Sequence, residues 1–131
     1  MRKGFHFIKT TLVLSMLICS SAWAAKITAI NFFQEGEQSH LDFVLDEPDV
    51  VFNKFQVAED KQIIIDFKNT EATDRVMRAF DTSEFSGSVI YVSAYKKPNS
   101  KQDIRVAIQL RDNVRSLIRR SGEKISLVIE N

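Results

Sequence analysis

Cysteine and histidine are scarce in this chain. Its 131 residues include one cysteine, Cys19, and two histidines, of which only His40 lies outside the first 24 residues. Those first residues resemble a removable leader sequence. Cleavage of this leader would leave a protein without a disulfide bond, a thiol nucleophile or a cysteine-bound metal. A single histidine also excludes a zinc site with two histidine ligands. We therefore expect no metal and no cofactor.

Long apolar runs are also missing, and the run near the N-terminus is short. Basic residues precede the short run Leu12–Ile18, and the small residues Ala22 and Ala24 follow it. A membrane-spanning helix needs about 20 mostly apolar residues, and this run is too short. The order is typical of a secretory signal peptide. We expect residues 1–24 to be cleaved near Ala24, leaving residues 25–131 outside the cytoplasm with no lasting transmembrane segment.

The chain also lacks an excess of basic residues. The expected leader holds three of the 18 basic residues and none of the 17 acidic ones, so residues 25–131 have a net charge of −2. Nucleic-acid-binding proteins usually show a clear excess of lysine and arginine, so we exclude nucleic acid as a partner. The remaining 107 residues are enough for one domain with a buried core.

What the chain does contain is alternation with a period of two. Apolar side chains alternate with mostly polar ones in residues 41–46, 62–68, 104–110 and 124–130. Less regular segments rich in strand-forming residues are 26–33, 50–57 and 89–95. Successive strand residues point to opposite faces, so each segment has one row for the core and one partly solvated row. The pattern predicts an all-β fold, a small two-sheet antiparallel β-sandwich of about seven strands.

Two segments permit a second interpretation. Thr73–Phe80 carries apolar residues at helical spacing behind a threonine that is a suitable N-cap, so it is either one short helix or an ordered loop. Val114–Arg120 also fits helical spacing. There we prefer a strand that turns at Ser121-Gly122 and returns as residues 124–129.

Four segments of the chain, taken in order, resemble a known family. Ile63–Asn69 is an apolar strand with an acidic residue near its end, and Gly87–Val92 follows after a variable segment. Ile104–Leu110 then sets an arginine in an apolar strand, and the closing hairpin Val114–Ile129 turns at a glycine. This order resembles the AMIN domain, and the resemblance covers about Lys26–Ile129.

The resemblance implies a small two-sheet domain of the bacterial envelope. AMIN domains occur on the N-terminal side of periplasmic N-acetylmuramoyl-L-alanine amidases and of type IV pilus secretins. They are associated with peptidoglycan binding and with placing their host protein at envelope sites. The resemblance thus implies a non-catalytic, periplasmic, peptidoglycan-binding module. The alternative is a protein-interaction module of a pilus or secretin assembly that docks by strand addition.

One departure from the family pattern affects the site. Val92-Ser93 stands where the family usually has Val-Arg, which weakens the case for a functional basic residue at this point.

Four candidate ligand-binding residues lie in the matching strands. Asp66 and Arg105 are charges enclosed by apolar neighbours, and Tyr91 and Tyr95 fall on one face of a strand. The two charges either have a structural role, in which they face solvent, cap a ladder or pair with each other across strands, or they contact a glycan or stem peptide. The two tyrosines either pack within the domain or stack on a sugar.

The closing hairpin is basic and supplies the last two candidates. Arg115 and Arg119 are expected to project from one face with Leu117 between them. Guanidinium groups match the carboxylates of peptidoglycan stem peptides, and anionic lipid headgroups would match them as well. The alternative is a solvated hairpin whose positive charge prevents edge-to-edge pairing.

A hydrolase is the third class of function. Asp42 and Asp46 are expected on one face of a strand, where a carboxylate pair suits glycoside cleavage. Ser39, His40 and Asp42 do not form a triad, because neighbours on a strand alternate faces. We expect His40 to be a solvated residue at a strand end, the two acids to keep the strand soluble, and the chain not to be an enzyme.

Overall fold

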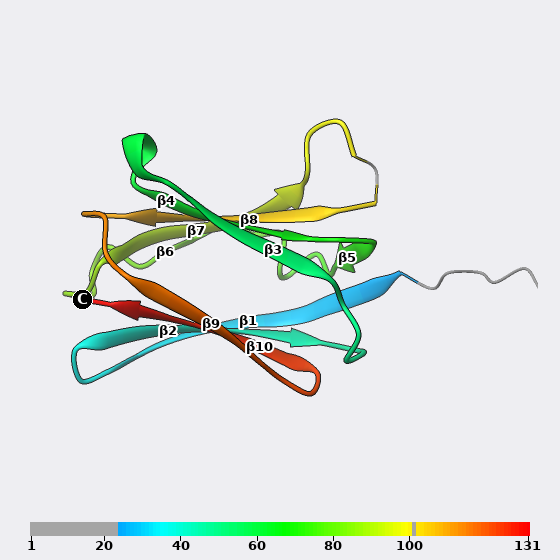
Figure 1. Cartoon of the computed structure of the whole chain (residues 1–131), viewed down its shortest axis with the longest axis horizontal. Coiled ribbons are helices and arrows are strands. Elements are labelled where there is room, and N and C mark those ends of the chain that lie inside the picture. Colours follow the sequence, from blue (N-terminus) through cyan, green and yellow to red (C-terminus); the bar gives the residue numbers. More distant parts are fainter. Residues whose placement is uncertain (1–23, 101) are drawn as a thin grey trace, which may run out of the picture.

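The computed structural model describes residues 24–100 and 102–131, which form a sandwich of two five-stranded sheets (Figure 1). Sheet A has the strand order β5-β1-β2-β10-β9, and sheet B has the order β3-β4-β8-β7-β6. The elements are β1 (Ala25–Glu35), β2 (Gln38–Leu45), β3 (Phe52–Val57), the 3-10 turn η1 (Ala58–Asp60), β4 (Gln62–Phe67), β5 (Thr70–Ala72), β6 (Phe80–Asp81), β7 (Val89–Lys96), β8 (Ile104–Leu110), β9 (Ser116–Ser121) and β10 (Lys124–Glu130). The predicted signal peptide and Cys19 lie outside the described residues, except for Ala24, and the cleavage stays a prediction.

The all-β sandwich is confirmed, with two corrections. The described residues form ten strands rather than about seven. The strands with no counterpart in the sequence pattern are β5 and β6, which have three and two residues and are too short to show a period. In addition, β5 pairs in parallel with β1, Ala25 lying opposite Thr70, so the sandwich is not wholly antiparallel.

The core lies between the sheets because one row of each long strand points inward. Phe43 of β2 and Phe67 of β4 meet across the gap with ring centroids 5.3 Å apart. Other large side chains that are fully buried are Ile27, Leu41, Ile63, Ile65, Val89, Ile108, Leu110, Ile125, Leu127 and Ile129. The predicted alternation is therefore present, and burial of this apolar surface is the main term that favours folding.

The segment Thr73–Phe80 is an ordered loop with one helical turn, and the short-helix interpretation is wrong. The Met77 N–H donates to the Thr73 carbonyl at 3.0 Å, and the Val76 N–H lies 3.4 Å from Thr73 Oγ1. This turn buries Val76. The chain then becomes extended, because Phe80 pairs with Val92 at the edge of sheet B.

The preferred strand in the closing hairpin is confirmed. β9 and β10 pair in antiparallel fashion, Ser121 lying opposite Lys124. The turn between them uses Gly122 with φ +61°, a conformation that glycine adopts without steric cost. The basic hairpin therefore lies at the edge of sheet A.

The long edge strands β3 and β9 lie on the same side of the sandwich (Figure 1). Side chains bridge this side. Lys54 Nζ donates to the Ser116 carbonyl at 3.1 Å, and burial lowers the pKa of this ammonium group. Arg120 donates to the Val50 carbonyl, and its guanidinium carbon lies 5.2 Å from the centre of the Phe52 ring. These bridges join the two sheets along one side.

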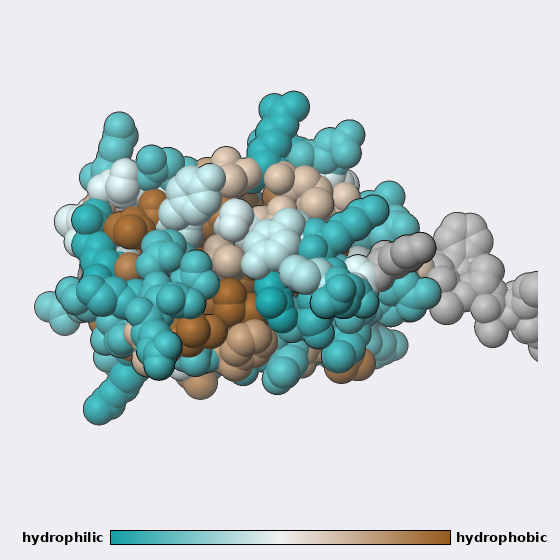
Figure 2. Space-filling view, turned by 90° about the horizontal axis from the view of Figure 1, so that it is seen from above, coloured by the Kyte–Doolittle hydropathy of each residue, from teal (hydrophilic) through white to brown (hydrophobic). Residues whose placement is uncertain are grey.

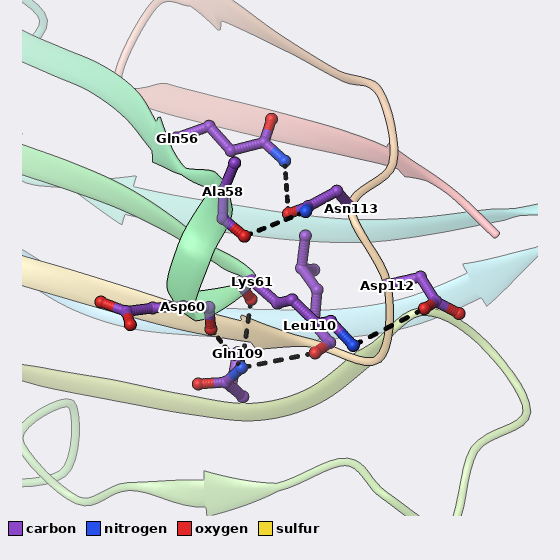
Figure 3. Close-up of polar contacts among 8 residues, drawn as sticks. All are labelled: Gln56, Ala58, Asp60, Lys61, Gln109, Leu110, Asp112 and Asn113. Carbon is purple, nitrogen blue, oxygen red and sulfur yellow. Dashed lines mark hydrogen bonds and ion pairs between the residues drawn. The ribbon is translucent and has the colours of Figure 1, made fainter.

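A polar network fixes the point where the chain passes from sheet B to sheet A (Figure 3). Gln109 Nε2 donates to the carbonyls of Asp60 and Lys61 at 2.8 and 3.1 Å. Asn113, in the loop between β8 and β9, donates from Nδ2 to the Ala58 carbonyl at 3.0 Å. The 3-10 turn η1 is thereby held against this loop, which leads directly to the basic hairpin.

Candidate binding faces

Four of the six predicted site residues lie on the outer face of sheet B. Strand pairing places Asp66 of β4 opposite Arg105 of β8, and Arg105 opposite Tyr95 of β7. Tyr91 lies opposite Gln109, four residues along β7 from Tyr95 and on the same face. Sheet B therefore brings these four residues onto one surface, although they come from three strands.

Asp66 and Arg105 pair with each other across strands, which is one of the alternatives that the sequence left open. Arg105 Nε donates to Asp66 Oδ1 at 2.8 Å, and Nη2 donates to Oδ2 at 3.1 Å. Lys97 Nζ lies 3.6 Å from the same carboxylate. Hydrogen bonds from Arg105 hold the pKa of Asp66 below its ordinary value, although burial of the carboxyl acts in the opposite direction. The Asp66 carboxylate in turn raises the pKa of Arg105.

Three aromatic side chains are exposed on this face. The exposed fractions are 37% for Phe55, 37% for Tyr95 and 44% for Tyr91. Between the tyrosines the surface is formed by the small residues Ser93 and Ala107, which lie opposite each other. Figure 2 looks onto this side of the molecule, and pale and brown side chains occupy its middle within a hydrophilic rim. The face is therefore broad and partly apolar.

The sequence pattern did not single out all the residues of this face. Arg105 has its guanidinium carbon 5.7 Å from the centre of the Phe55 ring. Gln62 Nε2 donates to Gln109 Oε1 at 3.1 Å, forming an amide pair between β4 and β8. Both glutamines occupied polar positions of predicted strands, so their outward direction was available from the sequence. The contact between them depends on which strands are neighbours, and the alternation does not encode this.

Arg115 and Arg119 lie on the opposite side of the sandwich, on the outer face of sheet A. Leu117 and Arg119 lie opposite Val128 and Ser126 of β10, and Arg115, just before β9, lines the same groove, so the two arginines and Leu117 share a face as predicted. They line a groove of about 440 Å³ together with Gln38, His40, Ser116, Val128 and Glu130. The six predicted residues therefore form two groups that cannot contact one compact ligand together.

His40 is not the solvated strand-end residue expected from the sequence. Its side chain is 16% exposed, and its ring stacks on Phe33 of β1 with centroids 4.7 Å apart and planes 6° apart. The two residues are direct partners in the antiparallel register of β1 and β2. The neighbouring strand supplies the cover, and alternation within β2 alone does not reveal it.

The acidic residues considered for hydrolysis are engaged in separate structural contacts. Asp42 accepts a hydrogen bond from Ser126 Oγ at 2.8 Å, and Lys124 Nζ lies 3.8 Å from its carboxylate. Asp46 lies just beyond the end of β2, where it accepts a hydrogen bond from the Lys26 N–H at 2.7 Å. The two carboxylates therefore have different partners and different environments.

Two further observations concern the described part of the chain as a whole. Residues 24–100 and 102–131 contain no group of three or more histidine, cysteine, aspartate or glutamate side chains arranged to hold a metal ion. Within the same residues, no helix has the length and hydrophobicity needed to cross a membrane.

The family model for the AMIN domain matches residues 29–129, which is most of the chain. No curated protein matches the chain closely enough to count as a relative. The chain therefore belongs to the AMIN domain family, whose members are envelope modules of periplasmic amidases and secretins.

Proposed function

We propose that this domain binds peptidoglycan without cleaving it, and that it positions its host protein in the periplasm after export. The main support for this function is the AMIN match over residues 29–129, because AMIN domains are envelope modules associated with peptidoglycan. The leader expected at residues 1–24 agrees with export.

The outer face of sheet B is the surface we assign to the glycan strand. Tyr91 and Tyr95 are four residues apart on β7, which corresponds to about 13 Å along a strand. A linear polysaccharide crossing this face would meet both rings, with Ser93 and Ala107 leaving room between them. Aromatic rings provide large apolar contact area together with a polar hydroxyl, a combination that suits sugar rings.

The ion pair beside the tyrosines supports this assignment. Asp66 and Arg105 are already joined by two hydrogen bonds, so a neutral sugar does not have to displace water from isolated charges. The guanidinium is held by Asp66 and lies near Phe55, which fixes its remaining N–H donors. Fixed polar groups lose less conformational entropy on binding than flexible ones do.

Co-sedimentation of the purified protein with insoluble sacculi at low salt tests this function. We expect the wild-type protein to sediment and the double variant Tyr91→Ala/Tyr95→Ala to lose about tenfold in affinity, since each aromatic contact contributes about 0.5 to 1.5 kcal/mol. Phe85→Ala is a matched control, because Phe85 is 46% exposed but lies outside sheet B. A wild-type protein that stays entirely in the supernatant contradicts the proposal.

The alternative, docking to a pilus or secretin protein by strand addition, has less support among the described residues. Side chains bridge the long edge strands β3 and β9, and the other two edges, β5 and β6, have three and two residues. Strand addition needs a run of free backbone N–H and C=O groups. Co-purification of the protein with a secretin, together with failure to bind sacculi, would favour this alternative.

A further inference from the structure

The groove on the outer face of sheet A has a floor made by one cross-strand row. Val128 of β10 lies opposite both His40 of β2 and Leu117 of β9, and all three residues line the groove. The imidazole ring is held in place by stacking on Phe33. The floor is therefore narrow and mostly apolar, unlike the broad tyrosine face of sheet B.

Charged residues flank this floor. Arg115 and Arg119 line the groove from the side of β9, and Glu130 lines it from β10. In the part of the chain that the structure describes, neither guanidinium has a carboxylate within 4.0 Å. Lys124 on the same face does have one, in Asp42. The groove thus offers two uncompensated guanidinium groups and one carboxylate.

The spacing of the two arginines matches the length of a short peptide. Arg115 and Arg119 are separated by four residues, which is about 13 Å in an extended strand. An extended peptide of four residues spans roughly 13 to 14 Å. A ligand of this length that carries carboxylates at separate positions reaches both guanidinium groups at once.

We propose that this groove binds the stem peptide of peptidoglycan. Its carboxylates pair with Arg115 and Arg119, the amine of its diamino acid faces Glu130, and its aliphatic parts lie over Val128 and Leu117. Arginine is suited to this role because its planar fork of donors matches a carboxylate. The inference rests on the proposed function and deepens it, since the glycan and the peptide bind to opposite faces of the sandwich.

NMR titration of the ¹⁵N-labelled protein with the free stem tetrapeptide, without sugar, tests this proposal. We expect the amide signals of His40, Leu117 and Val128 to shift and those of Tyr91 and Ser93 to stay in place. The same peptide with its carboxylates converted to amides should cause no shift. An oligomer of N-acetylglucosamine should give the opposite pattern, with shifts at Tyr91 and Ser93.

Variants separate the guanidinium contacts from general effects of charge. Arg115→Ala and Arg119→Ala should each weaken peptide binding about tenfold, as expected for a charge-assisted hydrogen bond, and leave sugar binding unchanged. Arg78→Ala, an exposed arginine outside the groove, is the matched control and should have no effect on either ligand.

The outcomes also distinguish this inference from the proposed function. If sacculi bind but the tetrapeptide causes no shift, or shifts the face of sheet B, the groove assignment is overturned and the proposed function stands. If sacculi do not bind at all, the proposed function fails first. If the amidated peptide binds as well as the free peptide, the pairing with Arg115 and Arg119 is wrong.

Discussion

The arginines on the two outer faces of the sandwich differ in their ion pairing and in their burial. On sheet B, Arg105 is joined to the buried Asp66 by two hydrogen bonds, and its side chain is 24% exposed. On sheet A, Arg115 and Arg119 line the groove, and among the described residues neither guanidinium group has a carboxylate oxygen within 4.0 Å. A paired and partly buried arginine mainly supports the fold, whereas an exposed and uncompensated one is available to a ligand.

The two faces also differ in shape. Tyr91, Tyr95 and Phe55 give sheet B exposed rings with small residues between the tyrosines, while sheet A has a groove over the row that contains His40 and Val128. The comparison indicates that residue type alone does not identify a binding residue. The partner across the strand decides whether an arginine or an aromatic ring is free to bind.

The largest expected effect is loss of the ion pair on sheet B. Asp66→Ala should destabilise the domain by about 3 kcal/mol, because Arg105 is left partly buried without a partner. Urea denaturation measures this change. Asp66→Asn, which keeps a hydrogen-bond acceptor, should cost less. A loss below about 1 kcal/mol for the alanine variant would show that the pair is already solvated.

The next largest expected effect is a difference in stability between alanine variants at two neighbouring residues of β9. Ile118 packs against the core, and Leu117 is 50% exposed on the groove side. Ile118→Ala should cost about 2 kcal/mol, and Leu117→Ala should change stability by less than about 0.5 kcal/mol. Thermal or urea unfolding of both variants makes the comparison. Equal losses would mean that the groove side of β9 is packed as tightly as its inner side.

Acid should weaken sheet B through the same ion pair, with a smaller effect than Asp66→Ala because a protonated carboxyl still accepts a hydrogen bond. The pKa of Asp66 is lowered in the folded protein by Arg105, while an unfolded aspartate has a pKa of about 3.9. The stabilisation is therefore complete above the unfolded pKa and is lost as the pH falls through the folded pKa.

Urea unfolding between pH 7 and pH 2.5 measures this loss, and Asp66→Asn is its control. The difference in stability between wild type and variant should shrink towards low pH. A difference that stays constant over this range would mean that Asp66 does not titrate as a partner of Arg105.

The smallest expected effect concerns the arginines of the groove. Arg119→Ala should change the free energy of unfolding by less than about 0.5 kcal/mol, because no ion pair or core contact is lost. Urea denaturation alongside Asp66→Ala tests this contrast directly. A loss above about 1 kcal/mol would assign Arg119 to the fold rather than to a ligand.

Much of the fold follows from local sequence. Alternation along β2, β4, β8 and β10 predicted both the strands and their inward rows, because side chains on a strand alternate strictly between two faces. The turn of the closing hairpin was also predicted, from Ser121-Gly122. The segments β5 and β6 were not predicted, since two or three residues carry no period and are extended only because a neighbouring strand pairs with them.

By itself, the amino-acid sequence determined that this is a two-sheet β domain and which side chains face outward. The tertiary structure decided which outward side chains meet: Arg105 reaches Asp66, His40 stacks on Phe33, and Arg119 lies on the far side of the sandwich. The physical reason is that alternation is a property of a single strand, whereas contacts across a face depend on strand order and register, which the packing of both sheets sets together.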